Sequence, residues 1–276
     1  YRLGRWTPLF VTLSDPTGPR EVELSIYNPL GQQYAMQVKQ MLALNPTAVT
    51  VPLYVPLSNN LEETTLTIRD ARSLRFLGQL KLRDADMMDG RSPSAVNDDD
   101  LFIGLSGSLQ SARLVSGQFG SDDSMAVGYV SPDHLPAAAI GYEGLDVLIL
   151  NQPDFNQIDA DQQRSIVQWV RSGGLLVVWP GTAPMPASSP IMDILPGRLG
   201  ENMVYDLPIA QLKRAGLAAR FAHLKGRAVE DVSTDASTAA LLGSNVLHSY
   251  RRWAGMGQVM MIPADLSSLL FDDPRR

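Results

Sequence analysis

Residues 145–181 read LDVLILNQPDFNQIDADQQRSIVQWVRSGGLLVVWPG, and this stretch decides the fold class. Residues 146–150 form a short apolar run, as in a strand that is buried on both faces, and residues 175–179 form a second one. Between them, Asp159 can start a helix through a capping box, and Gly173 can take the left-handed conformation that ends it. Strand, helix and strand at this spacing predict a parallel βαβ unit with a right-handed crossover.

Composition limits the kinds of function that this chain can have. Its 276 residues are 45% hydrophobic, carry a net charge of −6 and include no cysteine. No block of Lys and Arg appears, so nucleic acid is excluded as an expected partner. Without cysteine there is no thiol catalysis, thiolate metal site or disulfide. No apolar run approaches the roughly 20 residues that span a bilayer, so we expect no membrane insertion within the chain.

Outside the βαβ unit the chain divides into three regions. Residues 1–83 predict an immunoglobulin-like β-sandwich, because six short strands follow one another at roughly ten-residue spacing with turn residues between them. Residues 84–100 are acidic and aperiodic, which predicts a linker. Residues 101–276 return to an α/β pattern. The six strands of the first region are predicted at 6–13, 21–27, 34–44, 50–55, 61–69 and 74–82.

Three segments of the α/β region resemble a known family. They are GYEGLDVLIL at 141–150, QQxxIVQWVxxGG at 162–174 and RxxGxGQV at 252–259. Together they are similar to the class I glutamine amidotransferase-like domain, in the inactive form found in large membrane-anchored or secreted bacterial proteins, where it often follows a β-sandwich. The resemblance implies a flavodoxin-like three-layer α/β domain.

The same resemblance implies that the catalytic groups are gone. Active members carry a cysteine nucleophile on a strand-to-helix turn, and strand order places that turn on Trp179, Pro180 and Gly181, where no nucleophile stands. Pro180 also lacks the N–H that an oxyanion hole could use. The region 261–265, where the family carries a histidine, has none. The expectation is a vestigial nucleophile turn in a protein that is not an enzyme.

Polar residues after the first two strands of this region are the candidates for a ligand site. Ser106, Tyr129 and His134 are expected near the mouth of the old cleft, because ligands of such sheets bind at the carboxyl ends of the strands. Ser106 does not sit in a nucleophile elbow, which needs a glycine two residues after the serine. The three histidines are scattered through the sequence, so we expect no metal and no cofactor.

These observations favour a non-catalytic binding or assembly module. We expect it to be the extracytoplasmic, periplasmic part of a longer membrane-anchored bacterial protein, with a protein or another domain of the same polypeptide as its partner. Two alternatives stay open. One is a hydrolase or amidotransferase with relocated catalytic residues, and the other is a small-ligand or carbohydrate sensor that uses the vestigial cleft.

Overall fold

The computed structural model of the 276-residue chain divides into two compact units. One unit holds Tyr1–Asp99 with Ile140–Gly144, and the other holds Asp100–Ala139 with Leu145–Arg276. The predicted linker at 84–100 stays a prediction, since much of it is not described. The structure describes residues 1–30, 34–58, 63–82, 95–107, 124–152, 155–182, 184, 188–214, 222–241 and 246–265.

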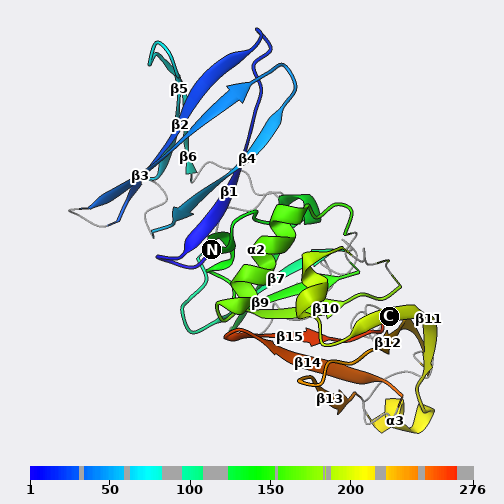
Figure 1. Cartoon of the computed structure of the whole chain (residues 1–276). Helices are drawn as coiled ribbons and strands as arrows, with labels where there is room; N and C mark the ends of the chain where they lie inside the picture. The colour runs from blue at the N-terminus through cyan, green and yellow to red at the C-terminus, as the bar shows by residue number, and fades with distance from the viewer. Residues whose placement is uncertain are drawn as a thin grey trace. The chain divides into compact units, whose positions relative to one another are not determined.

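The first unit is built from six antiparallel strands in two sheets (Figure 1). The ends of each strand fall within four residues of the predicted ones, so the strand predictions are confirmed. One sheet has the order β1-β4 and the other β3-β2-β5-β6. The strands are β1 (Trp6–Leu13), β2 (Arg20–Pro29), β3 (Ala35–Leu44), β4 (Val49–Pro56), β5 (Thr65–Asp70) and β6 (Phe76–Lys81).

Alternation along β2 and β4 forms the core of this unit. Val22, Leu24 and Ile26 point inward from β2 and are buried, as are Leu53 and Val55 on β4. Successive side chains of a strand point to opposite faces, so every second residue can enter the core. These residues belong to one apolar cluster that both sheets contribute to.

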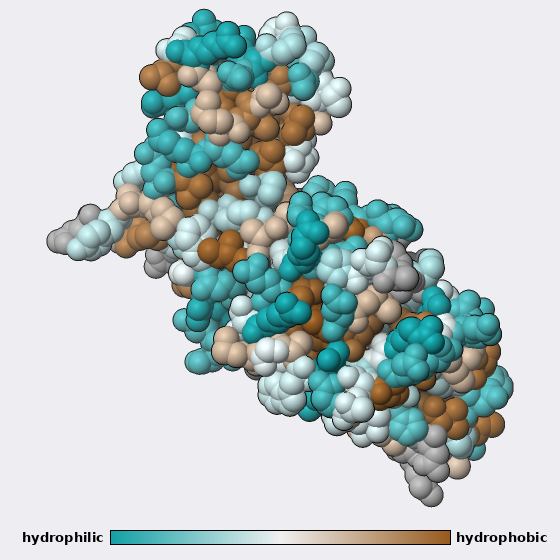
Figure 2. Space-filling view, in the orientation of Figure 1, coloured by the Kyte–Doolittle hydropathy of each residue, from teal (hydrophilic) through white to brown (hydrophobic). Residues whose placement is uncertain are grey.

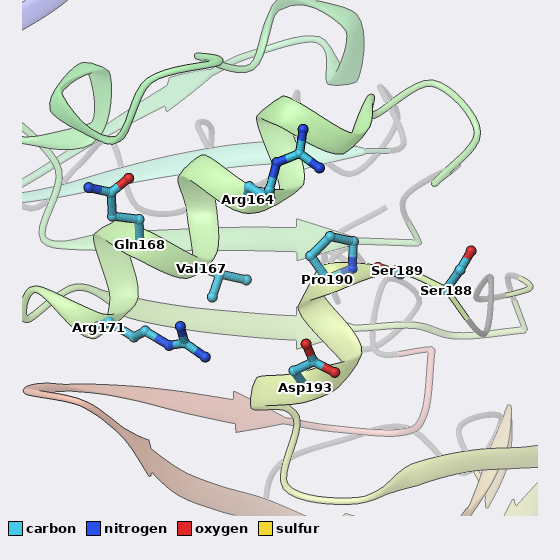
Figure 3. Close-up of a pocket in the computed structure, with 8 residues that line it drawn as sticks. All are labelled: Arg164, Val167, Gln168, Arg171, Ser188, Ser189, Pro190 and Asp193. Atoms are coloured by element: carbon cyan, nitrogen blue, oxygen red, sulfur yellow. The ribbon is translucent and has the colours of Figure 1, made fainter.

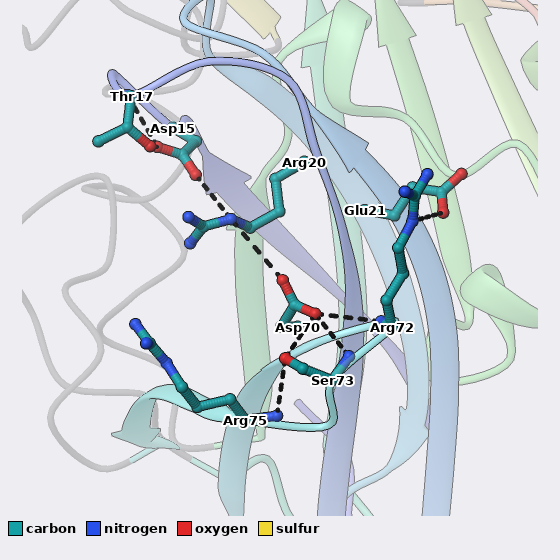
Figure 4. A network of polar contacts seen from close by, with 8 residues as sticks. All are labelled: Asp15, Thr17, Arg20, Glu21, Asp70, Arg72, Ser73 and Arg75. Carbon is teal, nitrogen blue, oxygen red and sulfur yellow. Dashed lines mark hydrogen bonds and ion pairs between the residues drawn. The ribbon is translucent and has the colours of Figure 1, made fainter.

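A network of ion pairs and hydrogen bonds ties two turns of the first unit together (Figure 4). Arg20 Nε lies 3.4 Å from Asp15 Oδ2 and 3.8 Å from Asp70 Oδ2. The hydroxyl and backbone N–H of Thr17 both donate to Asp15, and Ser73 donates to Asp70 in the same two ways. These hydrogen bonds favour the ionised carboxylates, so they lower the pKa of both Asp15 and Asp70.

The second unit is centred on a seven-stranded mixed sheet with the order β13-β14-β15-β10-β9-β7-β8 (Figure 1). The five strands from β15 to β8 are parallel to their neighbours, and β14 and β13 extend the sheet antiparallel. A separate antiparallel pair, β11 (Arg198–Asp206) with β12 (His223–Glu230), forms a second sheet. The strands of the large sheet are β7 (Leu101–Gly107), β8 (Met125–Tyr129), β9 (Val147–Asn151), β10 (Leu175–Trp179), β13 (Ser237–Ala240), β14 (His248–Ala254) and β15 (Gly257–Met261).

The predicted βαβ unit is confirmed in its parallel strands, its connecting helix and the capping of that helix. The helix α2 (Ala160–Arg171) connects β9 to β10, which pair in parallel. Asp159 accepts from the backbone N–H of Gln162, and the Gln162 side chain accepts from the N–H of Asp159, which completes the capping box. After the helix, Gly173 has φ +124°, a value that favours glycine.

The expected flavodoxin-like three-layer fold, and with it the overall fold class, is wrong. Strands dominate the described residues, and among them α2 is the one α-helix longer than the six residues of α3 (Ile209–Arg214). A three-layer domain needs helices over both faces of its sheet. Here the sheet instead continues through two antiparallel strands, and β11 with β12 adds a sheet of its own. Local periodicity identified individual strands. It did not reveal which further strands extend the sheet or which elements cover its faces.

Substituting Gly257 tests how closely β15 packs against the end of α2. A Cβ at this position would lie 2.0 Å from Val170 O and 2.3 Å from Gly174 O, both of them backbone atoms. We expect Gly257→Ala to destabilise the second unit by about 3 kcal/mol, because the backbone must move apart. Urea unfolding measures this change. Gly78→Ala, which meets no atom within 4 Å, is the control and should change stability little.

The Asp15 and Asp70 carboxylates should make the stability of the first unit depend on pH. Both pKa values are lowered in the folded chain. Their contribution is therefore fully present above the ordinary carboxyl pKa of about 3.9 and is lost as the pH falls through the lowered values. We expect Asp70→Asn to destabilise the unit at pH 7 and to have a much smaller effect near pH 3. An equal effect at both pH values, measured by urea unfolding, would contradict this expectation.

Candidate functional site

Polar side chains stand at the carboxyl ends of three neighbouring parallel strands. Ser106 lies near the end of β7, Asn151 ends β9 and Trp179 ends β10. Asn151 pairs in register with Gly107 on one side and with Trp179 on the other. Ser106 and Asn151 are both completely buried. This edge of a parallel sheet is where ligands of such sheets bind.

Several of these polar atoms have no hydrogen-bond partner. Within the described part of the chain they are Ser106 Oγ, both amide atoms of Asn151 and the indole Nε1 of Trp179. Buried polar groups in folded proteins are nearly always paired, because leaving one unpaired costs about 1–3 kcal/mol. The unpaired groups of Asn151 and Trp179, which lie on adjacent strands, therefore indicate a place where a hydrogen-bonding molecule belongs.

These residues lie on different faces of the sheet. Side chains of residues paired across strands project from the same face, so Asn151 and Trp179 share one face. Trp179 packs there against the buried cluster that includes Ile149 and Val177. Ser106 pairs with Leu150 and lies on the opposite face. The cluster that we call the Asn151 edge consists of Asn151, Trp179 and Tyr129.

Tyr129 joins the Asn151 edge through Gly107. Its hydroxyl donates to Gly107 O at 2.9 Å, and burial, followed by the charge of Asp133, raises its pKa. The phenol therefore stays protonated at neutral pH and remains a donor. Gly107 has φ +127°, and a Cβ there would lie 1.9 Å from Asn151 O. Only glycine fits, so no side chain projects from this position beside Asn151.

The structure does not bring Ser106 and His134 into hydrogen-bond contact. Ser106 Oγ has no hydrogen-bond partner among the described residues, whereas His134 Nδ1 lies 3.7 Å from Asp133 Oδ1 within the 3₁₀-helix η2 (Pro132–His134). Gln162 holds this segment against α2, because its Nε2 donates to Asp133 O at 3.1 Å and to Leu135 O at 2.7 Å. The cleft roles of Ser106, Tyr129 and His134 stay predictions.

Left-handed backbone follows two of the strands at this edge, and at Gln152 it is strained because that residue is not glycine. Gln152, directly after β9, has φ +43°, and Gly181, two residues after β10, has φ +54°. Gln152 packs against Gly181, whose Cβ position lies 2.7 Å from Gln152 Cγ. A non-glycine residue at positive φ costs of order 1–3 kcal/mol, and such residues cluster at ligand sites. The turn Trp179, Pro180 and Gly181 thus ends β10 beside Gln152, and its role as a former nucleophile turn is not tested by this geometry.

Asn151 and Gln152 are the residues that the sequence analysis missed. An amide at the carboxyl end of a buried parallel strand was the available signal, because that is where a side chain reaches a ligand.

Among the described residues no group of three His, Asp or Glu could hold a metal ion. No described helix is long and apolar enough to cross a membrane. The extracytoplasmic location stays a prediction.

Comparison with solved structures finds distant similarity to glycoside hydrolases. An exo-β-1,4-mannosidase from Opitutaceae bacterium strain TAV5 is 14% identical over 63% of this chain and 33% of its own, with a TM-score of 0.41. A catalytic mutant of Gan42B, a GH42 β-galactosidase from G. stearothermophilus, is 10% identical over 59% of this chain and 27% of its own, with a TM-score of 0.37. A β-galactosidase from Rahnella sp. R3 is 13% identical over 62% of this chain and 30% of its own, with a TM-score of 0.36.

No protein-family model and no curated protein matches the chain. The chain spans about a third or less of the glycoside hydrolases it resembles. The identification as an inactive class I glutamine amidotransferase-like domain is therefore wrong, because these neighbours are glycoside hydrolases. The expectation that the protein is not an enzyme is corrected by the same finding. Since these three TM-scores are below 0.5, the proposed function rests on this chain's own residues.

Replacing Asn151 separates stability from binding. Its amide is buried without a partner, so an apolar side chain of similar size removes an unsatisfied group. We expect Asn151→Leu to raise the free energy of unfolding by about 1–3 kcal/mol in the free protein. Chemical denaturation measures the change. Leu148→Asn, which places an amide at a buried apolar position of the same strand, should be strongly destabilising. A loss of stability in Asn151→Leu would contradict the assignment of an unpartnered amide.

Proposed function

We propose that this chain is part of a carbohydrate-active hydrolase and that the Asn151 edge binds the hydroxyl groups of its sugar. The observation that carries the proposal is the buried Asn151 amide, in which neither the oxygen nor the nitrogen has a hydrogen-bond partner within the described part of the chain. The hydrolase is one of the alternatives that the sequence leaves open. It is also the kind of protein to which the chain shows structural similarity.

The chemistry of the Asn151 edge suits a neutral ligand with many hydroxyls. A sugar hydroxyl is both a donor and an acceptor, and the Asn151 amide offers one acceptor and two donors to it. Trp179 adds an indole N–H, and its ring supplies an apolar surface. Tyr129 adds a hydroxyl oxygen that can accept from a sugar hydroxyl while its own proton is donated to Gly107 O. Because none of these groups is charged, the edge lacks the Arg or Lys that an anionic ligand would require.

The Asn151 edge serves binding and orientation within the proposed hydrolase. Hydrolysis of a glycosidic bond uses two carboxyl groups, one as acid and one as base or nucleophile. Asn151, Trp179 and Tyr129 supply neither of them. Their role is to position the sugar, and positioning contributes to the rate because it brings reacting groups together before the chemical step. The carboxyl groups are left to other residues of the hydrolase.

Sugar binding and hydrolysis by the purified chain test the proposal. Calorimetric titration with galactose, mannose and their β-1,4-linked disaccharides should show saturable binding of at least one of them. Asn151→Leu should abolish this binding, and Tyr129→Phe should weaken it about tenfold through the loss of one hydrogen bond. Trp253→Phe, an exposed tryptophan on β14, is the matched control and should bind like the unchanged chain.

Hydrolysis of nitrophenyl β-galactoside and β-mannoside, assayed with the longest chain that contains this segment, gives the second measurement. Asn151→Leu should reduce kcat/KM there. Saturable sugar binding that Asn151→Leu leaves unchanged, or no binding of any of these sugars, would overturn the proposal.

A further inference from the structure

A second polar site lies on the opposite side of α2 from the sheet core. A groove of about 610 Å³ runs between α2 and the 3₁₀-helix η4 (Pro190–Ile194) (Figure 3). Figure 2 shows hydrophilic residues over this exposed side of α2. Its volume falls in the range of small-molecule sites, about 300–1,000 Å³. The lining residues used below are Arg164, Val167, Arg171, Ser188 and Asp193.

Buried hydrogen bonds fix the two walls of the groove relative to each other. Ser189 Oγ donates to Gln163 Oε1 at 2.6 Å, and both residues are buried. On the far side of η4, Arg252 Nη1 donates to Asp193 O and to Leu195 O, each at 3.2 Å. Because η4 is anchored on both sides, Asp193 is held at a defined position opposite α2.

The groove carries one unpaired cation and one unpaired anion. Among the described residues, neither the Arg171 guanidinium nor the Asp193 carboxylate has an ion pair or a hydrogen bond, and Figure 3 shows both at the groove below Val167. Arg164 is paired with Asp161 on the same helix. The chain as a whole has a net charge of −6. An unpaired positive guanidinium in a groove is therefore opposite in sign to the net charge of the protein.

We propose that this groove, the α2–η4 groove, binds a small carboxylate that also bears hydroxyl groups, as a sugar acid does. The planar guanidinium of Arg171 matches a carboxylate with two parallel hydrogen bonds. The Asp193 carboxylate and the Ser188 hydroxyl accept from ligand hydroxyls across the groove. Val167, which also lines the groove, adds an apolar group against which the flank of the sugar ring can pack. The site is separate from the Asn151 edge and takes a charged ligand.

Arg171 also lies in the last turn of α2, where a positive charge stabilises the helix dipole. Lysine would serve that structural purpose equally well, but it lacks the planar fork. The two roles are therefore separated by comparing Arg171→Lys with Arg171→Gln.

Calorimetric titration of the whole chain with glucuronate, and with glucose as the uncharged probe, tests the α2–η4 groove. Glucuronate should bind saturably to the unchanged chain and to Asn151→Leu, and glucose should not bind to Asn151→Leu, in which the Asn151 edge is disabled. We expect Arg171→Gln to weaken binding by about tenfold or more and Arg171→Lys to weaken it severalfold, with the fold unchanged by circular dichroism. Asp193→Asn should weaken binding less, because an amide still accepts from a hydroxyl. Raising the salt concentration should weaken binding as well.

Two control variants keep the result specific. Arg198→Gln removes a guanidinium that is already paired with Glu230 and Asp231, and it should leave glucuronate binding unchanged. Asn151→Leu should also leave it unchanged, so failure here and failure of the Asn151 edge are distinguishable. The proposal is overturned by equal binding of glucose and glucuronate to the Asn151→Leu chain, by no saturable glucuronate binding, or by full binding in Arg171→Gln.

Discussion

The parallel pairing of β9 with β7 on one side and with β10 on the other is the constraint on which the second unit depends. Because both neighbours are hydrogen-bonded in register, all three strands end at the same edge. Asn151 is thereby placed beside Trp179 and against the backbone of Gly107. The crossover helix α2 begins at that edge, and its capping residue Gln162 also holds η2 in place. One pairing pattern thus assembles both the sheet core and the polar groups at its end.

The Asn151 edge is a place where stability and binding oppose each other. A leucine at position 151 would suit the apolar surroundings of β9 better than an amide without a partner. The positive φ of Gln152 adds local strain at the same edge. Natural proteins keep such unfavourable features mainly where a ligand offsets their cost. The α2–η4 groove differs, because its polar groups are exposed and its walls are fixed by satisfied hydrogen bonds such as that between Ser189 and Gln163.

Local signals made the βαβ unit predictable. The cap at Asp159, the stop at Gly173 and the apolar runs of β9 and β10 each depend on neighbouring residues alone. The pairing of β11 with β12 was not predicted, because the two strands are separated by a long connection and sequence periodicity does not reveal such a pairing. The fold class was wrong for the same kind of reason, since the number of layers is set by non-local packing. The α2–η4 groove depends on the hydrogen bond of Ser189 with Gln163, and no sequence motif predicts that contact.

The central claim is that polar groups at the carboxyl edge of β9 and β10 are unpaired in the free protein and paired in the complex. The chain has only four tryptophans, so the indole N–H of Trp179 can be assigned and followed by nuclear magnetic resonance. The account predicts an upfield, non-hydrogen-bonded proton shift in the free chain and a downfield move when saturating sugar is added. A downfield position that is already present without ligand, and that sugar does not change, would contradict it.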